Sequence, residues 1–314
     1  MSEKALHRFC VLTSVSTVFL LLAGALVTST GSGLAVPDWP LAYGKFFPPM
    51  VGGILFEHGH RMVAGTVAIL TVIQALLLWK FEKRTWVKRL GFAAVAIVLF
   101  QAGLGGMTVI LRLPPQVSIA HACLAQIYFC TSVIIATVTS ASWKEPVKER
   151  LSYEGGGDFL AQLALWINLG FFAQLLMGAS MRHLGAALAI PDFPTAFGGI
   201  LPPAWTFEIG LQFAHRTWAF GLVLLVSLFA YRVYTKHETQ MRLTVTMGIL
   251  LMLMSFQILL GAMIIWLKKP VPMTSTHLVI GALSFATSIV LTLQVFRLLE
   301  KEKIVSPQFE LSPA

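Results

Sequence analysis

Charged residues are scarce in this chain. Asp, Glu, Lys and Arg make up only 12% of its 314 residues, about half of their share in an average soluble domain. Hydrophobic residues make up 56%, and eight apolar segments are each long enough to cross a ~30 Å hydrocarbon core as a helix. These segments lie at about 9–28, 60–80, 90–112, 117–140, 159–182, 210–234, 242–266 and 274–298. The composition excludes a soluble globular protein and predicts an all-α integral membrane protein with eight transmembrane helices.

Cysteine is also rare. The chain has three, Cys10, Cys123 and Cys130, and each falls within a predicted helix. The segments between helices contain no cysteine pair that could form a disulfide, so a disulfide-stapled fold is excluded.

The basic residues are unevenly distributed among the connecting segments. With the N-terminus inside, sixteen lysines and arginines fall on the inner side and five in the outer connections, while Arg61 and Arg216 lie at outer helix ends. Lysine and arginine favour the cytoplasmic side of a membrane protein. We therefore predict a multi-pass protein of the cell inner (plasma) membrane with both termini cytoplasmic. The net charge of +9 reflects this topology and does not indicate a nucleic-acid partner.

The chain contains an internal duplication. Residues 24–49 align without a gap on residues 178–203, with twelve of 26 positions identical. The His-Arg pair at 60–61 matches the pair at 215–216, and residues 101–121 match residues 257–277. Matched blocks in the same order at nearly one offset indicate a tandem repeat.

The repeat predicts the domain organisation. Each half holds four helices, an even number, so both halves enter the membrane in the same direction. Two parallel four-helix bundles should then be related by a pseudo-twofold axis along the membrane normal. The predicted parts are an N-terminal half at 1–141, a cytoplasmic linker at 142–158, a C-terminal half at 159–300 and a cytoplasmic tail at 301–314.

Four of the eight histidines belong to the repeat: His60, His121, His215 and His277. Each lies near the start of an even-numbered predicted helix, which the topology places near the outer side. Ionisable residues in membrane segments are rare and usually face an interior or a cavity. Two imidazoles from facing helices can ligate a six-coordinate heme iron within a bundle. Zinc is less apt, because its tetrahedral sites usually recruit further ligands that these helices do not offer.

The two halves differ beside their first histidine. The first half reads Glu57-x-x-His60-Arg61, whereas the second has the neutral Gln212 in place of the acid. A carboxylate near a porphyrin can move protons or stabilise positive charge on a substrate. This asymmetry suggests that the first half performs chemistry and the second holds a permanent electron-carrying heme. The alternative is that Glu57 caps its helix.

An arginine follows the first histidine of each half. Arg61 and Arg216 would each suit a heme propionate, because charge-assisted hydrogen bonds to carboxylates are strong. The alternative is that both side chains reach for lipid head groups.

These features together resemble the heme A synthase family. The resemblance rests on the four-plus-four helices, the segment GALVTSTGSGLAVPDWPLAYGKFFPP at 24–49, the Glu-x-x-His-Arg motif at 57–61 and the histidine of each even helix, and it covers about residues 10–298. It implies an oxidoreductase that oxidises a methyl group of heme O to the formyl group of heme A, for cytochrome oxidase biogenesis.

The resemblance also implies roles for the histidines. His60 and His121 would bind the substrate heme O, with Glu57 implicated in catalysis, while His215 and His277 would ligate the iron of a heme b. Arg61 and Arg216 would lie beside the two hemes. The implied partners are the bilayer, a heme O synthase and an unidentified electron donor, and a homo-oligomer stays open.

One feature departs from the family. Many members carry two cysteines in the first outer loop, where this chain reads GLAVPDWPLAYG, without cysteine. A mechanism that relies on that pair is therefore excluded here, although cysteine-free members exist. The main alternative function is a quinol-linked diheme b-type cytochrome that only carries electrons. A parallel-repeat transporter is a weaker alternative, because it predicts helices broken near the membrane midplane, whereas the prolines here cluster in outer connections.

Overall fold

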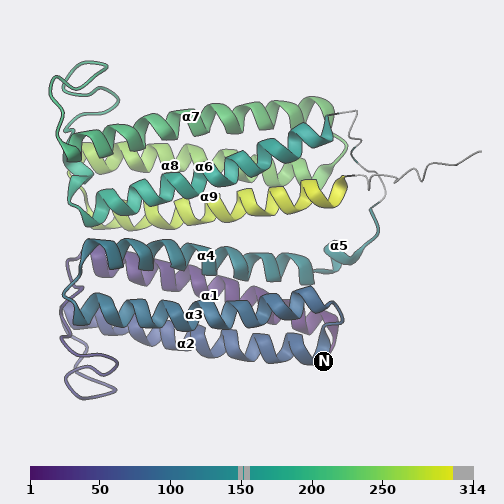
Figure 1. Ribbon diagram of the computed structural model, residues 1–314, viewed down its shortest axis with the longest axis horizontal. Helices are drawn as coiled ribbons and strands as arrows, with labels where there is room; N and C mark the ends of the chain where they lie inside the picture. Colours follow the sequence, from purple (N-terminus) through teal and green to yellow (C-terminus); the bar gives the residue numbers. More distant parts are fainter. Residues whose placement is uncertain (148–150, 152–155, 300–314) are drawn as a thin grey trace, which may run out of the picture.

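The computed structural model describes residues 1–147, 151 and 156–299. Within these residues the chain forms nine α-helices and one short 3₁₀ helix (Figure 1). The helices are α1 (Glu3–Ser29), α2 (Gly53–Phe81), α3 (Thr85–Ile110), α4 (Pro115–Thr139), α5 (Ala141–Lys144), α6 (Gly157–His183), η1 (Ala186–Leu188), α7 (Phe207–Lys236), α8 (Met241–Trp266) and α9 (Val271–Leu298).

Eight of these helices are long and apolar enough to cross a membrane, as predicted: all except α5 and η1. They begin earlier than the apolar runs suggest. Helix α2 starts at Gly53, so His60 lies about two turns inside the helix and does not open it. The physical reason is that peptide groups near the bilayer must be hydrogen-bonded internally, which favours continuing the helix through polar residues.

The helices form two adjoining groups (Figure 1). Helices α1–α4 pack against one another, as do α6–α9, and the groups meet where α1 and α4 contact α6 and α9. Leu21 and Phe129 of the first group belong to the apolar core of the second, so apolar side chains of both groups pack together at the junction. The pseudo-twofold axis stays a prediction. Most of the predicted linker is described, but residues 148–150 and 152–155 and the tail at 301–314 lie outside the described residues.

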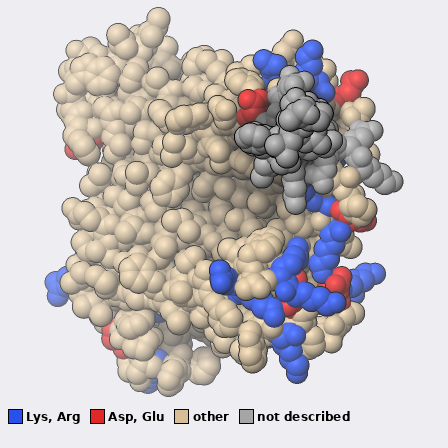
Figure 2. All heavy atoms as spheres, turned by 45° about the vertical axis from the view of Figure 1, so that its right-hand side comes forward, with Lys and Arg blue, Asp and Glu red and all other residues tan. Residues whose placement is uncertain are grey.

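The outer surface of the bundle is apolar, and its charges gather mainly at one end. Large apolar side chains are exposed along the flanks of the transmembrane helices. Figure 2 shows lysines and arginines concentrated around the end that holds the N-terminus. This arrangement identifies a multi-pass membrane protein. The opposite end, which carries the long loops 30–52 and 184–206, is called the outer end here, after the predicted topology.

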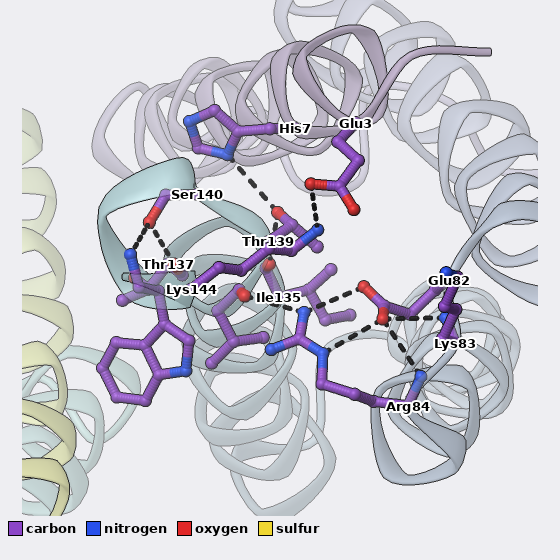
Figure 3. Close-up of polar contacts among 12 residues, drawn as sticks. Glu3, His7, Glu82, Lys83, Arg84, Ile135, Thr137, Thr139, Ser140 and Lys144 are labelled. Carbon is purple, nitrogen blue, oxygen red and sulfur yellow. Dashed lines mark hydrogen bonds and ion pairs between the residues drawn. The ribbon is translucent and has the colours of Figure 1, made fainter. Parts of the chain in front are cut away.

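Ion pairs join helices and turns of the first group at its inner end, the end that holds the N-terminus (Figure 3). The Glu82 carboxylate accepts hydrogen bonds from the Nε and Nη2 atoms of Arg84, at 3.0 and 2.8 Å, and Arg84 also donates to the carbonyl of Val138 on α4. The side-chain hydrogen bonds from Arg84 lower the pKa of Glu82 to about 2. A second pair joins Lys144 of α5 to Glu3 of α1 at 3.1 Å. These contacts tie the α2–α3 turn to α4, and α1 to α5.

Candidate heme-binding sites

The structure brings the predicted histidines together in two pairs. His60 on α2 and His121 on α4 lie within electrostatic range of each other in the first group. His215 on α7 and His277 on α9 do so in the second. All four rings are half-buried and lie about two turns inside their helices. Each group of helices therefore holds one pair of imidazoles near the outer end.

A glycine on the preceding helix stands opposite each imidazole. A Cβ added at Gly24 would lie 3.0 Å from Cε1 of His60, and at Gly178 it would lie 3.2 Å from Cε1 of His215. A Cβ added at Gly105 would lie 3.1 Å from Cε1 of His121, and at Gly261 it would lie 3.4 Å from Cε1 of His277. A side chain at Gly24, Gly105 or Gly178 would force the ring to shift by a few tenths of an ångström, whereas at Gly261 the contact would be an ordinary one. Glycine at these four positions thus lets each imidazole lie close to the preceding helix.

The Nδ1 atom of every one of these four histidines is buried without a hydrogen-bond partner. A buried polar atom left unpaired is costly, so four such atoms in matched positions indicate missing partners. Two imidazoles per group suit the axial positions of a heme iron. Within the described ranges, no group of three or more His, Cys, Asp or Glu residues could hold a metal ion. The residues present therefore fit a heme.

Three of the four histidines have a glutamine side chain as a hydrogen-bond partner. Gln174 and Gln257 place their amide nitrogens 3.1 Å from Nε2 of His215 and His277, respectively. Gln101 instead donates to the carbonyl oxygen of His121 at 2.9 Å. The position equivalent to Gln174 in the first half is Leu20. The second half thus places one amide beside each imidazole, and the first half has leucine at the position that would place an amide beside His60.

Glu57 holds the long loop that precedes its helix. Its side chain is buried, its Oε2 accepts the main-chain N–H of Val36 at 2.7 Å, and its Oε1 accepts from Nη2 of Arg61 at 2.5 Å. The Glu57 side chain therefore does not cap α2, whose N-cap is Gly52. Gln212 makes the equivalent loop contact, because its Oε1 accepts the N–H of Ile190 at 2.5 Å.

Arg61 and Arg216 donate hydrogen bonds to the same two loops. Arg61 donates to the carbonyls of Val36, Asp38 and Leu41 at 2.6–3.2 Å. Arg216 donates to the carbonyls of the three equivalent residues, Ile190, Asp192 and Thr195, at 2.8–3.2 Å. The Arg61 side chain is only 13% exposed, so it does not reach out to lipid head groups. Propionate binding by either arginine stays a prediction.

An aspartate closes each loop in the same way. Asp38 accepts the main-chain N–H groups of Tyr43 and Gly44, at 2.7 and 2.8 Å, and Asp192 accepts those of Phe197 and Gly198 at the same distances. Hydrogen bonds from Gly44 and Tyr43 lower the pKa of Asp38. The loops are thus built alike in both halves.

Arg182 occupies the junction between the two groups, and its position could not be predicted from the sequence. From the outer end of α6, its Nη2 donates to the carbonyl of Ala25 at 2.7 Å and to Oγ of Ser29 at 2.8 Å, both on α1. No carboxylate in the described part of the chain lies within ion-pair distance of it. It acts electrostatically on His277. Arg182 therefore places a positive charge beside the second histidine pair, at the junction of the two groups.

The fold and the paired imidazoles define a multi-pass membrane protein with two histidine pairs, one in each four-helix group. The chain belongs to the COX15-CtaA family of cytochrome oxidase assembly proteins, whose family model matches residues 52–289. Three curated relatives are named heme A synthase. The protein of Alkalihalophilus pseudofirmus is 28% identical over 92% of this chain and 98% of its own length. Those of Shouchella clausii and Symbiobacterium thermophilum are 30% and 31% identical, over 74% and 71% of this chain and 78% and 74% of their own lengths.

Proposed function

We propose that this protein is a heme A synthase, a membrane oxidoreductase that converts a methyl group of heme O into the formyl group of heme A for cytochrome oxidase. The observation that carries the proposal is the match to relatives of that name along most of the chain. The matched family region contains Glu57 and all four paired histidines. The quinol-linked diheme cytochrome is not favoured, because the matched relatives are named heme A synthase.

The two halves have different roles in this proposal. His60 and His121 bind the iron of heme O, the substrate whose methyl group is oxidised. His215 and His277 hold a heme b, which supplies electron transfer when bound. The amides of Gln174 and Gln257 stand 3.1 Å from the two second-half imidazoles and help to fix their rings, as suits a permanently bound cofactor. His60 has no such amide beside it and packs against Gly24, which suits a substrate that enters and leaves.

Glu57 is the proposed catalytic acid–base or electrostatic group. Its loop contact does not require a charge, because the Gln212 amide makes the equivalent contact in the second half. The negative charge, which is paired with Arg61, is therefore not needed for the contact with the Val36 N–H and can serve the reaction in this proposal. It lies one helical turn from His60 and is buried, where an ionised group acts more strongly on developing positive charge than it would in water.

The guanidinium groups of Arg61 and Arg216 hold the outer loops, and their remaining donor capacity is directed in this proposal to heme propionates. The protein lies in the cell inner membrane with both termini cytoplasmic, so both heme sites face the outer side. A heme O synthase delivers the substrate, and a separate donor supplies electrons.

The heme content of the purified protein tests this function. We expect one retained heme b in protein produced without a heme O source. With a heme O source, a second heme should appear as heme O, its hydroxylated form or heme A, identified by chromatography and mass. Two equivalents of heme b, with no modified heme even when heme O is supplied, would instead identify an electron-transfer cytochrome.

A further inference from the structure

The tips of the two long loops expose paired apolar side chains. Phe46 and Phe47 of the first loop are 76% and 79% exposed. Ile200 and Leu201, at the equivalent positions of the second loop, are 91% and 64% exposed. A single exposed apolar residue on a protein surface is ordinary, but two adjacent ones at matched positions in both repeats indicate a shared role.

The loop bodies beneath these tips are held firmly. The proline after each pair, Pro48 or Pro202, is buried, and a main-chain bridge closes each loop just before the tip. The first loop is further fixed by Glu57 and Arg61, as described above. A rigid loop that exposes its tip cannot bury these side chains by collapsing onto the protein, so they require another environment.

The position of the loops indicates which environment that is. In Figure 1 the loops project sideways beyond α2 and α7, away from the junction between the two groups, and do not extend along the helix axes into the space beyond the outer end. The neighbouring helix surfaces are apolar too, with Leu55 of α2 and Phe207 of α7 49% and 66% exposed. The tips therefore extend the lipid-facing surface of the bundle, at the level of the outer ends of the helices.

The chemistry of the tips fits the interfacial region of a bilayer. Aromatic side chains gather at membrane–water interfaces, and Trp205 of the second loop lies 57% exposed beside the tip. Lys45, next to the first tip, can place its amine among head groups while its stem lies against lipid. Neither tip segment, 45–49 or 199–203, contains an acidic residue that anionic lipid would repel.

From these observations we propose that both loop tips insert into the outer leaflet and anchor the loops to the bilayer. The occupant of the two apolar tips is phospholipid at the level of the head groups and upper acyl chains. Each anchor holds in place the loop whose main chain is bonded to Glu57 or Gln212. The bilayer thus helps to hold both loops in place, a role that does not depend on the reaction proposed above.

Depth-dependent fluorescence quenching tests this proposal. A fluorophore is attached at Phe47→Cys or Ile200→Cys, in a variant that lacks the three native cysteines, and the protein is placed in nanodiscs of phosphatidylethanolamine and phosphatidylglycerol. Val72→Cys on the flank of α2 serves as the lipid-exposed control and Lys83→Cys as the water-exposed control. We expect strong quenching by lipids labelled near the head group and weak quenching by iodide. Strong quenching by iodide alone would overturn the proposal, and so would protection from both quenchers, which would show that protein covers the tips.

Hydrogen exchange in the native-cysteine protein gives an independent test. The double variant Phe46→Ser/Phe47→Ser should exchange the Val36 amide about tenfold faster than the parent in nanodiscs, while the Ile190 amide stays unchanged as the internal control. The matching change at Ile200 and Leu201 should have the opposite pattern. Unchanged exchange at both amides in both variants would show that the tips do not seat the loops.

Discussion

Replacing Glu57 by glutamine separates the structural role of this residue from a chemical one. The second half already contains the substituted arrangement, since Gln212 accepts the N–H of Ile190 at 2.5 Å and donates to the carbonyl of Ala187 at 3.0 Å. In Glu57→Gln the Oε1 atom should accept the N–H of Val36 in the same way. The loop should therefore keep its conformation.

The stability cost of this change is expected to be small. The variant loses the 2.5 Å ion pair with Arg61, which by itself is worth about 1.5–3 kcal/mol as a charged hydrogen bond. Arg61 keeps three carbonyl acceptors, and the new amide gains a donor, so the net loss should be about 1 kcal/mol. If the carboxylate acts in the reaction, turnover should fall by about 10²- to 10⁴-fold.

The assay compares conversion of heme O to heme A with thermal stability in the same preparations. We expect Glu57→Gln to melt close to the parent protein, to retain heme b and to accumulate unconverted heme O. The control Gln212→Glu introduces an acid at the matched position of the other half and should leave turnover within a few-fold of the parent. Full turnover by Glu57→Gln would refute the chemical role and leave Glu57 as a loop-holding residue.

Three further predictions concern the packing and the charges of the bundle. Gly24→Ala should impair binding of heme O, because its Cβ would lie 3.0 Å from the imidazole opposite, whereas Gly103→Ala, with no atom within 4 Å, should bind heme O normally in a spectroscopic titration. Because the pKa of Glu82 is depressed in the folded protein, its carboxylate should stabilise the protein fully above pH 4.5 and lose this contribution as the pH falls from 4.5 to about 2. The melting temperature should therefore drop more steeply over that pH range in the parent than in Glu82→Gln. Equal slopes would contradict this prediction. Arg182→Gln removes a positive charge near the second histidine pair and should lower the midpoint potential of the heme held there; an unchanged potential in a redox titration would show that this charge does not reach the heme.

Much of the fold follows from patterns that are local in the sequence. Eight apolar runs predict eight spans, and the matched blocks at 24–49 and 178–203 predict that the loops of the two halves are alike. The structure confirms the spans and repeats the loop contacts residue by residue, as at Asp38 and Asp192. The helix starts were less predictable, because hydropathy marks where a segment turns apolar and not where its backbone becomes helical.

The details of the sites depend on contacts between distant segments. The bond from Val36 to Glu57 joins a loop to a helix 21 residues later, and no local pattern encodes it. The sequence predicts a propionate or a head group as the partner of Arg61 and gives no sign of the loop carbonyls that it also binds, because only the folded loop defines their positions. Arg182 has no counterpart in the first half, where Thr28 is equivalent, so the repeat gave no signal for its contact with α1.

The central claim is that this chain converts heme O to heme A in its first half. The most direct test is to express the chain together with a heme O synthase in a host that makes no heme A, and to extract and identify the hemes. The parent chain should yield heme A, and His60→Ala should yield only heme O while still retaining heme b at the second pair. Absence of heme A from the parent, despite heme O in the membrane and correctly inserted protein, would contradict the account.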